Sequence, residues 1–170
     1  QRFGYPSLRD THDVEFKDLN RDELIDLEVL DAELGPKTIR LARSYVTSWT
    51  VSVARMKTHN AVVVTLSIKN TAIGSIHNPD RHGVSHDPRP MNLSLVRLNQ
   101  AACPALSVID GVVGMEGGGP VDGTPIPSGV ALAGTDPLAV DLVGTELMGF
   151  DPRTVGYLWY LGRLSGLSRG

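Results

Sequence analysis

The apolar and polar residues in the first third of the chain alternate with the period of β-strands. Three segments show this alternation, at 14–19, 27–34 and 38–42, and Gly35-Pro36 separates the last two. We therefore expect a hairpin that turns at Gly35-Pro36, with the 14–19 segment as a further strand beside it.

Strands and helices alternate along the rest of the chain. The β-branched run at 50–56 predicts a strand that ends at Lys57-Thr58-His59. The segment 61–73 begins like a strand but continues with apolar positions near helical spacing, which favours a helix. At Asp136-Pro137 a good N-cap precedes a good first helical residue. The remaining elements are expected to be helices at 91–102, 136–148 and 154–165 and strands at 105–110 and 128–134.

This order predicts a single α/β domain over residues 1–170, with a mixed, largely parallel sheet, helices on its faces and an amino-terminal β-hairpin. We expect the strands at 105–110 and 129–134 to be neighbours and parallel, with the helices at 91–102 and 136–148 packed on the sheet. Loops that leave the carboxyl ends of such strands form the ligand crevice. An uncovered sheet edge would also favour a homo-oligomer.

Composition and charge exclude several classes of protein. The net charge of -3, without clustered basic residues, argues against a nucleic-acid partner. No stretch approaches the roughly 20 apolar residues of a membrane helix, so we expect a soluble, cytoplasmic protein with no membrane partner. The start at Gln1, without a methionine, leaves open a removed targeting signal and a longer parent domain. The single cysteine, Cys103, allows no internal disulfide and no iron–sulfur cluster within this chain, and we expect it to be buried.

Two basic segments are candidates for anion binding or proton transfer. Lys57 and His59 follow a predicted strand, where a lysine can hold a phosphate or carboxylate and a histidine can ligate a metal or move a proton. Lys69-Asn70 lies in an otherwise apolar segment, and a buried ammonium is costly without an anionic partner. The alternative for each lysine is a side chain that simply faces solvent.

The glycine-rich segment 111–120 is expected to be a loop whose backbone N–H groups cradle an anion or a flat ligand, or else a plain wide turn. It lacks the Gly-Lys-Ser/Thr of a phosphate loop and does not match G-x-G-x-x-G. Asp110 and Glu116 could join His59 around a divalent metal, or could face water and brace the loop. The glycines assigned to ligand binding are Gly114, Gly117, Gly118 and Gly119.

A polar segment at 74–90 contains His77, His82 and His86 and reads as a solvated lid, because it has no compact metal-binding frame on a helix. Asp136 is expected to cap a helix and Asp141 to lie on its face, although both are also candidates for ligand binding. The chain has no G-x-S-x-G elbow, which argues against a Ser-His-Asp hydrolase.

Four sequence blocks together resemble the prokaryotic family called domain of unknown function 362: MKTH at 56–59, IKN at 68–70, VIDGVVGMEGGGP at 108–120 and LAGTDPLAVD at 132–141. The resemblance covers about residues 50–152 and implies that an amino-terminal part of the family domain is missing. Some members carry ferredoxin-like modules, which implies a redox association that this chain, without their cysteines, does not inherit. The family's motifs coincide with Lys57, His59, Lys69, Asn70, Asp110, Glu116, Asp136 and Asp141.

Three kinds of function remain open. The first is a ligand-binding or enzyme-like domain that holds a small anionic molecule, with Lys57, His59, Lys69 and Glu116 as candidate catalytic residues. The second is a metal-binding accessory domain of a redox system, and the third is a non-catalytic scaffold. For the first, we expect Lys57, His59, Lys69, Asp110 and Glu116 to converge on one cleft.

Overall fold

The computed structural model describes residues 4–166 and confirms an α/β fold with an amino-terminal hairpin and a mixed sheet. The hairpin consists of β1 (Leu24–Leu30) and β2 (Pro36–Ala42). The five-stranded sheet consists of β3 (Val51–His59), β4 (Val63–Thr65), β5 (Leu106–Gly118), β6 (Asp122–Ile126) and β7 (Val130–Gly134). The helices are α1 (Arg43–Thr47), α2 (Ser67–Gly74), α3 (Pro88–Ala101), α4 (Pro137–Leu147) and α5 (Gly156–Leu164), and the 3-10 turns are η1 (Tyr5–Asp10), η2 (Leu19–Arg21), η3 (Asn78–Gly83) and η4 (Pro152–Thr154).

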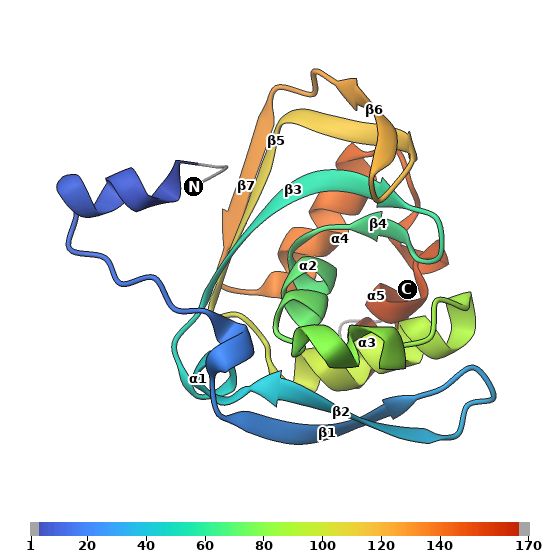
Figure 1. Ribbon diagram of the computed structural model, residues 1–170. Coiled ribbons are helices and arrows are strands. Elements are labelled where there is room, and N and C mark those ends of the chain that lie inside the picture. The colour runs from blue at the N-terminus through green and yellow to red at the C-terminus, as the bar shows by residue number, and fades with distance from the viewer. Residues whose placement is uncertain (1–3, 167–170) are drawn as a thin grey trace.

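The hairpin forms where the alternation predicts it. β1 and β2 pair antiparallel from Leu24–Ala42 to Leu30–Pro36, and the Asp31 carboxylate closes the turn by accepting a hydrogen bond from the Gly35 N–H at 2.7 Å. The strand expected at 14–19 is wrong. Residues 4–18 are exposed and lead away from the body of the molecule (Figure 1), so their alternation has no apolar face to bury.

β5 is the centre of the larger sheet. It pairs parallel with β3 along one edge, while on the other edge its first half pairs antiparallel with β7 and its second half antiparallel with β6. The strands at 105–110 and 129–134 are therefore neighbours, but the expected parallel pairing is wrong. A parallel pair needs a crossover connection, usually a helix, whereas here the chain between the two strands is itself extended and folds back as β6.

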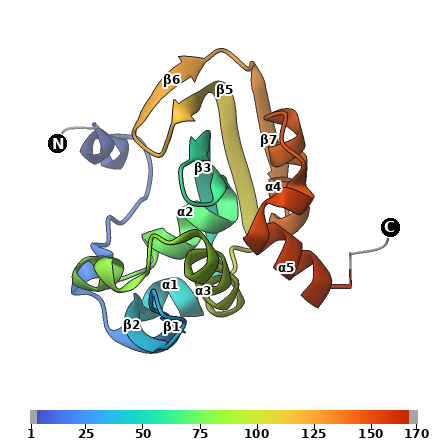
Figure 2. The same cartoon turned by 90° about the vertical axis from the view of Figure 1, so that its right-hand side faces the viewer.

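The helices gather on one side of this sheet (Figure 1). Along β3, Val51 and Val53 are 45% and 68% exposed, whereas Ala54 and Met56 are both 3% exposed beneath the helical layer. Figure 2 shows α4 running beside β5 and β7. The helix predicted at 91–102 exists as α3, but it packs on β1, α2 and α5 and not on the sheet.

The segment predicted as one helix at 61–73 is divided. Its β-branched start forms β4, which returns antiparallel beside β3, and its second half forms α2. The reversal is tight, since Val64 N–H bonds to the Val62 carbonyl and Val63 between them has φ 68. A β-branched residue rarely adopts this conformation, so the turn at the end of β3 is strained.

Candidate functional site

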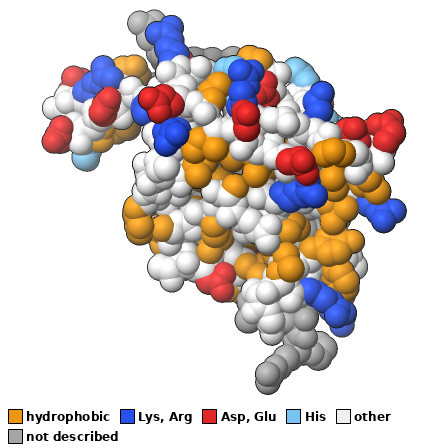
Figure 3. All heavy atoms as spheres, turned by 90° about the horizontal axis from the view of Figure 1, so that it is seen from below, with side chains coloured by type: hydrophobic (Ala, Val, Ile, Leu, Met, Phe, Trp, Pro, Cys, Tyr) orange, Lys and Arg blue, Asp and Glu red, His pale blue; other side chains and the backbone are white. Residues whose placement is uncertain are grey.

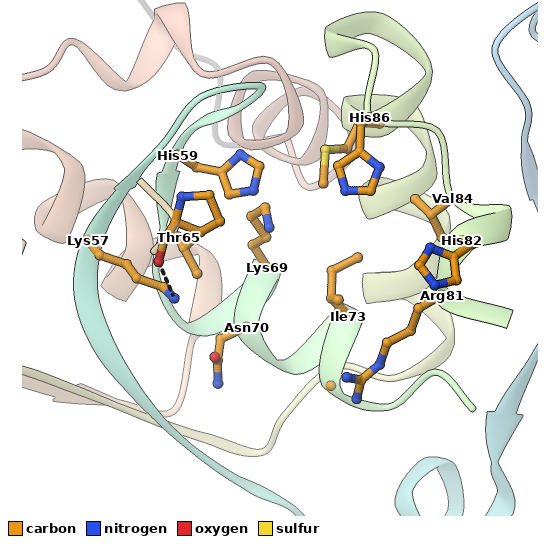
Figure 4. Close-up of a pocket in the computed structure, with 13 residues that line it drawn as sticks. Lys57, His59, Thr65, Lys69, Asn70, Ile73, Arg81, His82, Val84 and His86 are labelled. Atoms are coloured by element: carbon orange, nitrogen blue, oxygen red, sulfur yellow. Dashed lines mark hydrogen bonds between the residues drawn. The ribbon is translucent and has the colours of Figure 1, made fainter. Parts of the chain in front are cut away.

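A pocket of about 420 Å³ opens where β3, β4, α2 and the segment leading into α3 meet (Figure 4). Three of the predicted catalytic residues, Lys57, His59 and Lys69, line it together with the predicted ligand-binding Asn70. The rest of its wall is Thr65, Ile73, Gly74, Arg81, His82, Val84, His86, Met91 and Pro120.

The strained turn between β3 and β4 sets one wall. It brings Lys57 into register with Thr65, and the Lys57 ammonium donates to the Pro120 carbonyl at 3.2 Å. The Thr65 hydroxyl is buried in this wall without a hydrogen-bond partner among the described residues.

His59 is held as a neutral ring. Its Nδ1 accepts a hydrogen bond from the Ala61 N–H at 3.1 Å, so we assign the proton of the neutral ring to Nε2. Burial, together with the charges of Lys69, His86 and Lys57, lowers the pKa of His59 to about 4. At neutral pH this imidazole offers the pocket an N–H donor and no charge.

Lys69 lies in the first turn of α2. The Asp141 carboxylate, from α4, fixes that turn by accepting from the Ser67 and Ile68 N–H groups, both at 2.9 Å. Lys69 is 6% exposed, and its ammonium makes neither a hydrogen bond nor an ion pair with any described residue. Burial, and then the charge of Lys57, lowers the pKa of Lys69 to about 8.

The histidine-rich segment forms one wall of the pocket, and its His82 and His86 side chains are exposed to solvent. The guanidinium of Arg40, in β2, donates two hydrogen bonds of 2.7 and 2.9 Å to the carboxylate of Asp80, in η3. The backbone N–H of Arg40 donates a third, of 3.0 Å, to the same carboxylate. This Arg40–Asp80 pair holds the segment so that Arg81, His82 and His86 line the pocket. His77, by contrast, does not line the pocket, and its Nδ1 lies 3.9 Å from the Asp80 carboxylate.

The charges around the pocket all have one sign. Two lysines, one arginine and three histidines line it, whereas no aspartate or glutamate of the described residues does. The imidazoles of His59 and His86 and the ammonium of Lys69 are turned toward one another (Figure 4). Elsewhere, as on the face in Figure 3, acidic and basic side chains are interspersed. Such a concentration of basic groups in a partly buried cavity favours an anionic occupant.

The glycine-rich segment is part of β5 and not a loop. Gly114, Gly117 and Gly118 pair with β6, and neither they nor Gly119 line the pocket. A β-carbon on Gly119 would collide with the carbonyl of Thr58. Gly114, Gly118 and Gly119 thus allow β5, β6 and the end of β3 to approach closely, whereas Gly117 adopts a positive φ. Of the segment 111–120 only Pro120 reaches the pocket wall.

Asp110 and Glu116 do not join the lysines, so the expected convergence of all five residues is wrong for these two. Asp110 accepts from the Val112 N–H at 3.0 Å and lies 4.0 Å from Arg55, while Glu116 is exposed beside a separate hollow of about 70 Å³. The proposed metal ligands His59, Asp110 and Glu116 are therefore apart. Within residues 4–166, no group of three or more His, Cys, Asp or Glu side chains is placed to hold a metal ion.

Two further aspartates of the family motifs accept hydrogen bonds from backbone N–H groups at the starts of helices. Asp136 caps α4 as predicted, accepting from the Leu138 N–H at 2.9 Å. Asp141 lies in α4, as expected, but its side chain is fully buried against the start of α2, and burial raises its pKa to about 7. Cys103, expected to be buried, is exposed.

Sequence reasoning missed part of the pocket, namely Thr65, Arg81, His82 and His86. One available signal was the density of basic residues at 74–90, where two arginines and three histidines occur close together. The contact that orders this segment gives no such signal, because a pairing such as Arg40 with Asp80 joins residues far apart in the sequence.

Comparison of this chain with known proteins identifies a family but no reaction. The family described as "Domain of unknown function (DUF362)" matches residues 1–146, which extends the resemblance back to the first residue. The "Thylakoid-associated protein sll1697" of Synechocystis sp. (strain ATCC 27184 / PCC 6803 / Kazusa) is 29% identical over 108 residues, which is 62% of this chain and 34% of that protein. The chain thus spans about a third of the length of this curated relative.

No solved structure matches the fold of this chain. Between residues 4 and 166, no helix combines the length and apolar character needed to cross a bilayer. Because the family model matches residues 1–146, which is most of the chain, the chain belongs to the DUF362 family.

Proposed function

We propose that this domain binds a small anionic molecule in the pocket formed by β3, β4, α2 and η3. The observation that carries the proposal is the composition of the wall, which includes Lys57, Lys69 and Arg81 and no acidic side chain of the described residues. Ligand pockets of a few hundred Å³ with a few convergent polar groups are typical small-molecule sites.

Each basic group has a distinct part in binding. Lys69 supplies a desolvated charge that no described protein group neutralises, so an anion gains a strong, charge-assisted interaction there. Lys57 and Arg81 approach the same volume from β3 and η3. His59 adds a donor that can hydrogen-bond the ligand without adding charge.

The wall also has an apolar side. Ile73, Val84 and Met91 line the cavity together with the basic groups. A molecule with an anionic end and a short carbon skeleton would satisfy both parts, whereas a fully hydrated inorganic ion would use only one.

Isothermal titration calorimetry with inorganic phosphate tests the proposal. We expect the protein to bind phosphate and the Lys69→Met variant to bind it at least about tenfold more weakly, because one charge-assisted hydrogen bond contributes roughly 1.5–3 kcal/mol. Lys17→Met is the matched control, since Lys17 pairs with Asp22 outside the pocket. Equal affinities in all three proteins, or no binding by any of them, would overturn the proposal.

A further inference from the structure

Lys69 differs from the other lysines of the chain. There are four: Lys17, Lys37, Lys57 and Lys69. Lys37 is exposed, Lys17 lies 2.9 Å from the Asp22 carboxylate, and Lys57 donates to the Pro120 carbonyl. Lys69 alone combines burial with an ammonium that no described residue bonds, and it faces a cavity.

We propose that Lys69 is a reactive amine that forms an imine with a small oxo acid, an anion that carries a ketone or an aldehyde. The inference rests on the proposed function, because the anionic group would bring the carbonyl to the lysine. It adds a covalent step and names the class of ligand.

The surroundings of Lys69 favour its unprotonated form, which is the nucleophile. It is buried, and it lies near the positive charge of Lys57. With a pKa of about 8, roughly a quarter of Lys69 is unprotonated at pH 7.5, against roughly one part in a thousand for an ordinary lysine.

The neighbouring groups fit the chemistry. The His59 ring is turned toward Lys69 (Figure 4), and its Nε2–H can donate to the carbonyl oxygen while the Lys57 ammonium holds the carboxylate. The Lys69 nitrogen attacks the carbonyl carbon and passes a proton to the carbonyl oxygen, which gives a carbinolamine. The hydroxyl group of the carbinolamine then leaves with the remaining N–H proton as water, which forms the carbon–nitrogen double bond, and no oxidant or reductant takes part.

Borohydride trapping with pyruvate tests the step. The protein is incubated with pyruvate, reduced with sodium borohydride and digested with trypsin. Reduction of the imine adds the mass of pyruvic acid less one oxygen atom, and an adduct on Lys69 blocks cleavage there, so the 58–81 peptide replaces 58–69 and 70–81. We expect at least about tenfold more adduct on Lys69 than on the exposed Lys37 of the same chain.

Lys69→Arg is the decisive variant, because arginine keeps the positive charge but does not form the imine under these conditions. We expect the total trapped adduct per protein to fall in this variant, and we expect phosphate to protect Lys69 from trapping in the unaltered protein. Phosphate binding with equal adduct on Lys69 and Lys37 would overturn the imine and leave the proposed function standing. Neither phosphate binding nor trapping would overturn both.

Discussion

The end of β3 and the glycine-rich part of β5 are paired side by side. The end of β3 with α2 contains two of the chain's distinctive sequence blocks, and the glycine-rich part of β5 contains another. The first region points basic side chains into a cavity and leaves the ammonium of Lys69 without a partner among the described residues. The second brings backbone against backbone, with Thr58 Oγ1 donating to the Gly117 carbonyl at 3.1 Å. Adjacent motifs can thus have different physical causes, one chemical and the other steric.

The largest loss of stability is expected when a single methyl group is added to the closely packed glycine-rich segment 111–120. We expect Gly119→Ala to lower the free energy of unfolding by about 3 kcal/mol, because the added β-carbon collides with the Thr58 carbonyl and backbone atoms must move. Urea denaturation followed by circular dichroism measures the loss. Gly162→Ala in α5 is the control, since a β-carbon added there would meet no described atom within 4 Å and alanine favours a helix. Equal stability of the two variants would contradict a steric role for Gly119.

On the pocket side, Asp141 should make stability depend on pH. Its pKa of about 7 in the folded protein lies above its ordinary value of 3.8, so the folded state holds the proton more tightly. The contribution to stability is complete below about pH 4 and is lost as the pH rises through 7. Compared with Asp141→Asn, the unaltered protein should lose stability on the order of a few kcal/mol between pH 4 and pH 8.

Subtracting the Asp141→Asn curve removes the contribution of the other titrating groups, including His59. Chemical denaturation at several pH values in that range gives the difference directly. Parallel curves for the two proteins would show that Asp141 does not change its protonation on unfolding in this range.

The smallest effects are expected for the two acidic residues near the glycines. Asp110→Asn and Glu116→Gln should each change the free energy of unfolding by no more than about 0.5 kcal/mol, because both side chains face solvent. Phosphate affinity should also stay the same, since neither side chain lines the cationic pocket. A tenfold loss of phosphate affinity in either variant would show that the two regions form one binding site.

Local patterns predicted the elements that depend on local chemistry. The hairpin at Gly35-Pro36, the Asp136 cap and the helix near α3 all follow from residues close in sequence. The sequence blocks also pointed to Lys57, His59 and Lys69 as members of one site, and these three line one pocket.

The remaining features depend on long-range contacts. Glycines at 111–120 suit a loop and a closely packed strand equally well, and only β6 and the end of β3 decide between them. The burial of Asp141 depends on α2, which lies far earlier in the chain. The role of 74–90 depends on the grip of Arg40 on Asp80. No short window of sequence contains both partners of such a contact.

The Arg40–Asp80 ion pair also connects the pocket wall to the hairpin. Ile76, just before η3, forms a bridge with Leu41 of β2, so the wall containing Arg81 and His82 rests on the hairpin. Proteins open in cooperative units well before they unfold globally. If β1 and β2 detach as such a unit, this wall loses its support, and the free energy needed to open the pocket cannot exceed that needed to release the hairpin.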